Sequence, residues 1–156
     1  MLLPPNPTNG CFVCGGANAH GMHLTFEQDD ALQRIRGRFR IGAQYQGATG
    51  YLHGGMIATL LDEVMAKVSR FAKEHAVTAD LKVEYRKPVP VGDELIVEGW
   101  ETGRNGRMRL REGEIRTDLG VVLARGQAKF VVIDPTRFQR GASAGAKALG
   151  EEGSAP

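Results

Sequence analysis

A His-Gly-Gly tripeptide at residues 53–55 opens a stretch with helical spacing that also contains an acidic residue, Asp62. The first amide groups of a helix have no acceptor within the helix, and their partial positive charge attracts anionic oxygen. Gly54 and Gly55 would let a carbonyl group come close to those amides. The tripeptide could therefore form an oxyanion hole for acyl transfer, although a helix entry loop that needs glycine only for its turn has the same pattern.

Asp62 stands on a predicted helix face of small and apolar residues. None of the side chains expected beside it is basic: Ala58, Thr59, Met65 and Ala66. A carboxylate partly removed from water has a raised pKa and can act as a base or a nucleophile. A surface carboxylate, or one buried against another chain, fits the pattern equally well. The adjacent Glu63 has Lys67 four positions later, the spacing of a solvent-facing ion pair, so we expect it to be structural.

The spacing of these groups limits how they could act together. Asp62 follows Gly54 by eight residues, which is about 12 Å along a helix axis. One carbonyl group cannot contact both within a single chain. A second copy with an antiparallel helix would bring the carboxylate of one chain to the amide of the other. The sequence therefore predicts a two-fold homodimer with two shared sites, which could pair further into a tetramer.

The elements that would position these groups follow from periodicity. Residues 54–74 have the helical period, and their apolar stripe marks the face that packs on a sheet: Ile57, Leu60, Leu61, Val64, Met65, Val68, Phe71 and Ala72. Strand-like alternation occupies residues 22–28, 32–41, 78–86, 94–102, 107–116 and 121–133. Asn105-Gly106 predicts a tight hairpin turn. The order β-β-α-β-β-β-β predicts the α+β class, with one antiparallel sheet and one helix on its apolar face.

Composition sets the outer limits of the interpretation. The chain has 156 residues, 42% of them hydrophobic and 24% charged, as in a globular domain. A net charge of +2 argues against a general nucleic-acid binder. No apolar run approaches the roughly 20 residues of a membrane span, and no signal peptide is recognisable, so we expect a cytoplasmic protein. We predict an irregular arm over 1–10, one domain over 11–138 and a disordered tail over 139–156.

Arginine alternates with apolar residues in 34–40 and in 107–111. We interpret both stretches as the solvated outer face of the sheet, which the near-neutral net charge favours over an RNA-binding surface. Cysteine and histidine gather near the N-terminus as Cys11, Cys14, His20 and His23, a set that could hold zinc. The spacing is tighter than in zinc fingers, and no βαβ context supports a redox role. We expect a packed turn over the sheet edge, without a metal or a cofactor.

Three motifs resemble the hotdog-fold thioesterases of the phenylacetate-degradation (PaaI-like) type: GYLHGGMIATLLDEVM (50–65), TADLKVEYRKPVPVGDEL (78–95) and CFVCGGANAHGMHLTF (11–26). The resemblance covers about residues 11–133. It implies an antiparallel sheet of five to six strands wrapped around one long central helix. It also implies hydrolysis of an acyl-CoA thioester to the free acid and CoA. The third motif is similar to a Cys-x-x-Cys-Gly pattern of one branch that has no evident metal requirement, with Met22 where Leu is more usual.

Carried over by position, the resemblance gives roles to five residues. Asp62 would be the base or nucleophile, supplied by the partner subunit. The Gly54 amide, with Gly55, would polarise the thioester carbonyl. His53 would shape the loop or contact the substrate, and Thr78 would steady the attacking water.

Substrate-binding residues follow less directly from the resemblance. Many relatives have Asn six residues before the histidine, where this sequence has Gly47 with Gln46 beside it. Gln46 could replace the Asn if the loop shifts. The CoA phosphates would need cations, and the candidates, each of which also fits a solvated strand end, are Arg86, Lys87, Arg104 and Arg107.

Two other functions fit the same fold. The first is a non-catalytic acyl-CoA sensor or binding protein, but such a protein has no need of a desolvated carboxylate at Asp62. The second is a hydratase or dehydratase, which usually pairs a carboxylate with a histidine, whereas His53 lies at the start of the helix. We therefore rank the thioesterase first. The preferred acyl group stays open.

Overall fold

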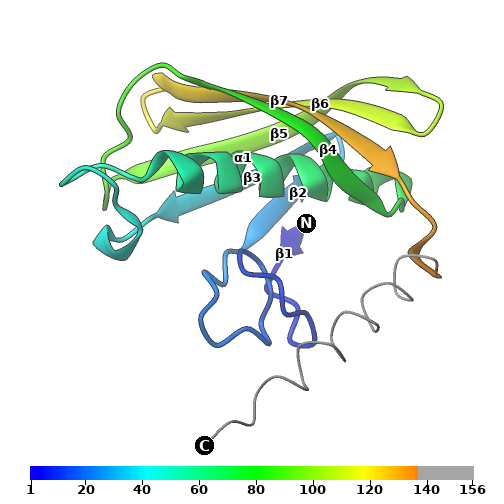
Figure 1. Ribbon diagram of the computed structural model, residues 1–156, viewed down its shortest axis with the longest axis horizontal. Helices are drawn as coiled ribbons and strands as arrows, with labels where there is room; N and C mark the ends of the chain where they lie inside the picture. The colour runs from blue at the N-terminus through cyan, green and yellow to red at the C-terminus, as the bar shows by residue number, and fades with distance from the viewer. Residues whose placement is uncertain (137–156) are drawn as a thin grey trace, which may run out of the picture.

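The computed structural model describes residues 1–136, which form one antiparallel sheet with one α-helix on its inner face (Figure 1). The helix, α1, spans Gly54–Lys67. Seven strands form the sheet in the order β1-β2-β3-β5-β6-β7-β4. Their bounds are Leu2–Leu3 (β1), Phe26–Asp29 (β2), Arg34–Arg40 (β3), Ala76–Tyr85 (β4), Glu94–Asn105 (β5), Met108–Thr117 (β6) and Val122–Val132 (β7). The predicted α+β class is confirmed, with one strand more than expected.

The predicted apolar stripe of α1 packs against the inner face of the sheet. Its fully or nearly fully buried members are Ile57, Leu60, Leu61, Val64 and Met65. Strands β3, β5, β6 and β7 contribute buried side chains, among them Ile35, Val97, Ile115 and Phe130. Burying a side chain of this size is worth about 1.5–3 kcal/mol, so this contact fixes how α1 lies on the sheet.

Three glycines in register let α1 approach the sheet closely. Gly99 of β5 pairs with Gly113 of β6, which pairs in turn with Gly126 of β7. A Cβ atom at Gly99 would lie 3.0 Å from the backbone carbonyl carbon and oxygen of Val64, and one at Gly126 would lie 3.1 Å from Met65 Cε. The three positions form a channel without side chains under α1, which we call the glycine channel.

We predict that Gly99→Ala lowers the free energy of unfolding by about 1–3 kcal/mol. The added methyl group meets helix backbone, which cannot rotate aside, whereas Gly126→Ala meets the flexible end of Met65 and should cost less. Gly103→Ala is the matched control, because its Cβ would make only an ordinary 3.5 Å contact with Leu110. Urea denaturation measures all three. Equal stability of Gly99→Ala and Gly103→Ala would show that α1 does not rest on the glycine channel.

The helical segment ends earlier than predicted. A continuous helix to Glu74 was expected, but α1 ends at Lys67 and a 3-10 helix, Val68–Ala72, follows. Lys73 then adopts the left-handed conformation, with φ of 53°, and the chain turns into β4. The 3.6-residue period alone does not distinguish an α-helix from a final 3-10 turn, which explains the error.

The interpretation of residues 107–111 as a solvated face was wrong. Arg109 and Arg111 point inward and are 8% and 1% exposed, whereas Met108 and Leu110 are 36% and 37% exposed. The inward arginines have acceptors that local alternation could not reveal, since Arg109 Nε lies 2.8 Å from Glu74 Oε2. The arginines of β3 do lie on the outer face as predicted, where Arg34 and Arg36 pair with Glu98.

Arg111 holds the C-terminal end of α1. Its Nη1 donates to the carbonyl oxygen of Met65 at 2.9 Å and to Ser69 Oγ at 2.8 Å. The guanidinium group also lies 4.7 Å from the centre of the Phe130 ring. The Val68 amide also donates to the Met65 carbonyl oxygen, so Arg111 adds a second, charged donor at this end and opposes the helix dipole.

Arg111→Met should therefore reduce the free energy of unfolding by about 1–3 kcal/mol despite the similar side-chain volume, because the buried Ser69 hydroxyl and the Met65 carbonyl oxygen each lose a charged donor. Arg38→Met is the control, since the Arg38 side chain is 56% exposed and pairs with Glu94 at the surface. That change should stay within about 0.5 kcal/mol of wild type. Calorimetric unfolding of both variants compares them, and a wild-type melting profile for Arg111→Met would contradict this role.

An extra residue in β4 changes which side chains face α1. Thr78 and Asp80 pair with consecutive residues of β7, so Ala79 forms a bulge. The bulge reverses the alternation, and Thr78 lies on the same inner face as Leu81. Strict alternation would have placed Thr78 on the outer face with Asp80. β4 is also an edge of the sheet within residues 1–136.

The N-terminal segment lies on the side of α1 away from β5, β6 and β7 (Figure 1). Its start is not wholly irregular, because Leu2–Leu3 pairs with β2. Glu63 is not solvent-facing as predicted but lies under this segment, although its ion pair with Lys67, 3.2 Å from Nζ to Oε1, is confirmed. Among residues 1–136, no helix is both long enough and apolar enough to cross a membrane. The predicted tail, 139–156, lies outside the described residues.

Candidate active site

Asp62 and Thr78 are brought together by α1 and β4. Thr78 Oγ1 donates a hydrogen bond to Asp62 Oδ1 at 2.7 Å. Burial raises the pKa of the Asp62 carboxyl above its ordinary value; the Thr78 hydrogen bond partly offsets this rise, and the charge of Glu63 adds to it. A carboxylate that is held in one orientation and has a raised pKa is suited to accept a proton from water.

The start of α1 leaves one amide group available. His53 caps the helix: its Nδ1 accepts from the Gly55 amide at 2.9 Å, and its carbonyl oxygen accepts from the amides of Met56 and Ile57 at 2.9 and 3.1 Å. Three of the first four amides of α1 thus have acceptors. The remaining one, the Gly54 amide, has no acceptor within residues 1–136. Gly55, expected to share the polarising role, is engaged by the His53 cap in this structure.

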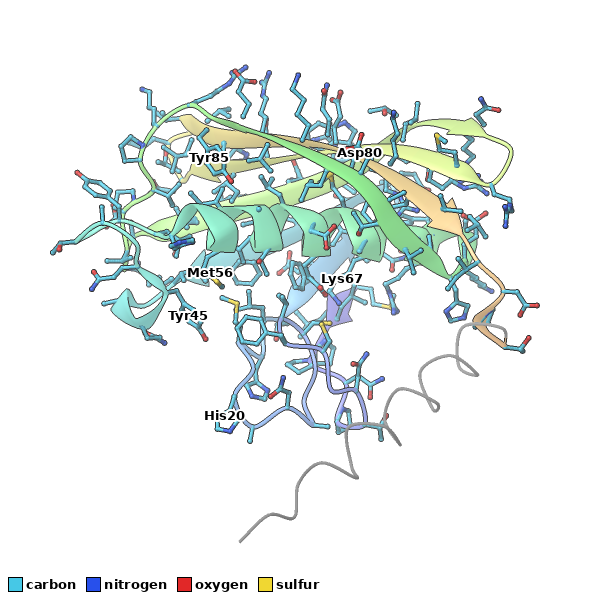
Figure 2. The ribbon with its side chains drawn as sticks, in the orientation of Figure 1. His20, Tyr45, Met56, Lys67, Asp80 and Tyr85 are labelled. Atoms are coloured by element: carbon cyan, nitrogen blue, oxygen red, sulfur yellow. The ribbon has the colours of Figure 1, made fainter. Side chains whose placement is uncertain are left out.

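Tyr85 lies beside Gly54, a placement that sequence reasoning missed. Its hydroxyl donates to the Gly54 carbonyl oxygen at 3.0 Å, and its side chain is on the surface where α1 begins (Figure 2). The residue is 54% exposed, so part of the ring is open to a ligand at the amide. Periodicity placed Tyr85 on the apolar face of its strand, and nothing in the local pattern distinguished it from a core residue.

Contacts of the loop before α1 explain the residue types at positions 46 and 47. Gln46 Oε1 accepts from the Gly50 amide at 3.2 Å, which closes the loop on itself. A Cβ atom at Gly47 would lie 3.2 Å from both Cα and Cδ2 of His53. Glycine at position 47 therefore lets the loop pack against the capping histidine. In this arrangement the Gln46 side-chain oxygen is turned toward its own loop.

The candidate cations do not form one patch within a chain. Arg86 and Lys87 follow β4 at the end of the molecule where α1 begins, and Arg86 pairs with Glu84 at 3.1 Å. Arg104 pairs with Glu101 near the β5–β6 turn, at the opposite end (Figure 1). The separation follows from β5, which runs the length of the sheet between the two locations.

The comparisons with known proteins agree with this geometry. The family model "Thioesterase superfamily" matches residues 49–124, which include α1, Asp62 and Thr78. Over this part, about half of its length, the chain is similar to the thioesterase superfamily. It is 30% identical over 118 residues to acyl-coenzyme A thioesterase THEM4 of Rattus norvegicus, covering 75% of this chain and 51% of that protein. The chain thus spans about half the length of the curated relatives it matches.

Solved structures of the superfamily share the fold. A crystal structure of a thioesterase superfamily protein aligns with a TM-score of 0.73 and 30% identity, covering 78% of this chain and 62% of that one. The Escherichia coli PaaI protein from the phenylacetic acid degradation operon aligns with a TM-score of 0.61 and 19% identity, covering 65% and 74%. The hotdog fold implied by the sequence motifs is confirmed.

A hollow of about 780 Å³ lies close to the Asp62–Thr78 pair, although neither residue lines it. It begins at Ala66, one helical turn beyond Asp62, and includes Val77, the neighbour of Thr78. Arg70, Lys73 and His75 also line it, together with Glu74, whose charge is paired with Arg109. The small and apolar wall could accommodate a chain, and the cations could accommodate anionic groups; sequence reasoning had not connected these basic residues with the site.

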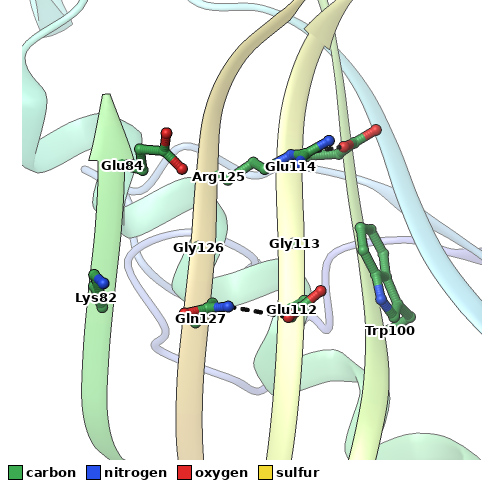
Figure 3. A pocket seen from close by; sticks show the side chains of 9 residues that line it. All are labelled: Lys82, Glu84, Trp100, Glu112, Gly113, Glu114, Arg125, Gly126 and Gln127. Atoms are coloured by element: carbon green, nitrogen blue, oxygen red, sulfur yellow. Dashed lines mark hydrogen bonds and ion pairs between the residues drawn. The ribbon is translucent and has the colours of Figure 1, made fainter. Parts of the chain in front are cut away.

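A second hollow, of about 430 Å³, lies on the outer face of the sheet, away from α1 (Figure 3). Trp100 forms one side of it, and its charged groups pair across strands, as Arg125 does with Glu114. Gln127 donates to Glu112 at 3.1 Å. Such cross-strand pairs stabilise a sheet, and none of the predicted site residues lines this hollow.

Cys11 and Cys14 pack over α1, not over the sheet edge as predicted. Cys11 Sγ donates to Glu63 Oε2 at 3.7 Å. Burial raises the pKa of the Cys14 thiol to about 12, and Glu63 adds to the rise. His20 and His23 are exposed, and Figure 2 shows His20 at the outer tip of the segment. The four-residue cluster considered from the sequence is therefore not formed.

Proposed function

We propose that this protein is an acyl-CoA thioesterase that hydrolyses a thioester to the free acid and CoA. The observation that carries the proposal is the half-buried Asp62 carboxylate, oriented by Thr78 on a helix whose first amide has no acceptor within residues 1–136. The curated relatives that the chain matches are named acyl-coenzyme A thioesterases.

In the proposed reaction the thioester carbonyl oxygen accepts from the Gly54 amide, which stabilises the negative charge that develops on it. Asp62 takes a proton from water as the water oxygen bonds to the carbonyl carbon. The carbon–sulfur bond then breaks, and the CoA sulfur receives the proton. Alternatively, Asp62 attacks the carbonyl carbon and expels the CoA thiolate, which takes a proton from solvent, and water then hydrolyses the resulting mixed anhydride to the free acid and the Asp62 carboxylate. Thr78 fixes the carboxylate in either route.

We further propose that two chains share each site. Asp62 and Gly54 are about 12 Å apart along one helix, so the carboxylate that acts on a thioester at Gly54 would come from an antiparallel partner helix. The helix face around Asp62 is small, with Ala58 and Ala66, and permits close approach. The edge strand β4, beside this face, carries backbone groups that a second copy could pair with. A homodimer, or a tetramer of two dimers, would complete the sites.

A thiol-release assay on short, medium, long and aromatic acyl-CoAs tests the function. Turnover of at least one class supports the thioesterase and identifies its substrates. Tight acyl-CoA binding without turnover of any class would instead support the alternative, a non-catalytic acyl-CoA sensor. The retained carboxylate at Asp62 favours the enzyme, because a binding protein gains nothing from a desolvated acid next to the acyl carbonyl.

A further inference from the structure

We propose that Cys11, Cys14 and Glu63 form a zinc site that fastens the N-terminal segment to α1. One sulfur from each cysteine and one carboxylate oxygen lie within 4.8 Å of one another. This is the one such group of His, Cys, Asp or Glu side chains found within residues 1–136. The proposal does not depend on thioester hydrolysis, since none of the three residues is assigned a step in that reaction.

The separations suit tetrahedral zinc. With Zn–S near 2.3 Å and Zn–O near 2.0 Å, a sulfur and an oxygen on the same ion lie about 3.5 Å apart. Cys11 Sγ and Glu63 Oε2 are 3.7 Å apart, so an ion could bind with little movement. Three protein ligands leave the fourth position of the tetrahedron to water.

The two cysteines are held by a turn that is already closed. The Gly15 amide donates to the Cys11 carbonyl oxygen at 3.0 Å, and Asn9 Oδ1 accepts from the Cys11 amide at 2.7 Å. The third donor comes from the rigid helix α1. Because turn and helix fix the donors before an ion arrives, binding would require little ordering of the chain.

Charge balance also fits a divalent cation. Binding releases one proton from each thiol to solvent, so two thiolates and one carboxylate bring three negative charges to a Zn²⁺ ion. The remaining single negative charge is matched by Lys67, whose Nζ lies 3.2 Å from Glu63 Oε1. A lysine in this position resembles the outer groups that orient metal ligands in other sites.

Local spacing could not have revealed this set. The sequence pairs the cysteines with His20 and His23, but both are exposed. Glu63 is 52 positions from Cys11 and reaches the cysteines only because the N-terminal segment crosses α1. The site would therefore join two parts of the fold that have few other polar links.

The test uses the full chain, expressed with zinc in the medium, purified without chelators and desalted. Atomic emission spectrometry should give about one zinc per chain. Cobalt(II) substitution should produce a thiolate charge-transfer band. Removing the metal with a chelator should lower the melting temperature, because an ion that binds only the folded chain stabilises it. Absence of zinc, with no melting shift on adding zinc, would overturn the proposal.

Single substitutions test whether these three side chains hold the ion. Cys11→Ser and Cys14→Ser should each lose the stoichiometric zinc and the cobalt band, and Glu63→Gln should weaken zinc binding at least about tenfold. His20→Ala with His23→Ala is the matched control and should keep both signals. Zinc that persists without the cysteines, unchanged affinity in Glu63→Gln, or a Cys11–Cys14 disulfide in freshly lysed, alkylated protein would each overturn it.

Discussion

Asp62→Asn should lower kcat for the best acyl-CoA substrate by about 10²–10⁴-fold, the usual contribution of a positioned general base. Asn has nearly the same shape and can still accept the Thr78 hydrogen bond, now held at 2.7 Å. It cannot take up a proton from water, nor attack a carbonyl carbon as a carboxylate does. The loss should therefore appear in kcat, with little change in thermal unfolding.

Thiol-release kinetics on the purified variant measure this effect. Asp80→Asn is the matched control, because Asp80 lies just beyond the bulge on the outer face and pairs loosely with Lys129 at 3.8 Å. It should keep wild-type kcat. If Asp62→Asn folds normally and turns over at the wild-type rate, another group must activate the water.

Gly54→Pro should lower kcat by about 10²–10³-fold, the cost of removing one oxyanion donor. Proline has no amide hydrogen but is well tolerated as the first residue of a helix. His53 before it has ψ of 137°, which is compatible with a following proline. A Cβ atom at this position would lie 3.6 Å from the nearest atom of the Tyr85 ring, an ordinary contact. The change therefore replaces the amide hydrogen by the Cδ atom of the proline ring and leaves the start of the helix otherwise little disturbed.

Gly54→Ala distinguishes the effect of the lost amide hydrogen from the effect of the added Cβ atom. It places a Cβ in the same location but keeps the amide, so it should retain most of the wild-type kcat. Equal losses in both variants would mean that bulk at position 54 blocks the substrate. An active Gly54→Pro would mean that the carbonyl is polarised by a different donor.

Mixing the two inactive variants tests whether sites are shared. In a heterodimer of Asp62→Asn and Gly54→Pro chains, one site carries both defects and the other carries neither. After random exchange half the dimers are mixed, so about one quarter of wild-type activity should return. If each chain held a complete site, mixing would restore nothing.

The parts of the fold that sequence predicted were those governed by local rules. The apolar stripe of α1 and the turn at Asn105-Gly106 follow from helical period and from glycine's tolerance of positive φ, which is 55° at Gly106. The inward direction of Arg111 could not be predicted, because its acceptors are the carbonyl end of a helix 46 residues earlier. The glycine channel was equally invisible, since it needs the register of three strands.

In the candidate site, too, the local features could be predicted from the sequence and the long-range ones could not. Asp62 could be singled out because its helix neighbours are visible in the sequence and none is basic. The hydrogen bond that engages the Gly55 amide with His53 could not be predicted, because it depends on the direction of one imidazole ring. Tyr85 was missed because its strand alternates as a core strand does, while its place at the start of α1 is a tertiary fact.

The single extra residue in β4 makes the position of the Thr78 hydroxyl depend on the register of the strand as well as on the residue types in it. The core anchors the strand at Leu81 and beyond, so a strand that alternated regularly through Ala79 would turn Thr78 to the outer face and present the Ala79 methyl group to Asp62. Deleting Ala79 would remove the bulge and leave Thr78 on the inner face. Residue identity alone, compared column by column, does not record whether the strand is bulged or regular.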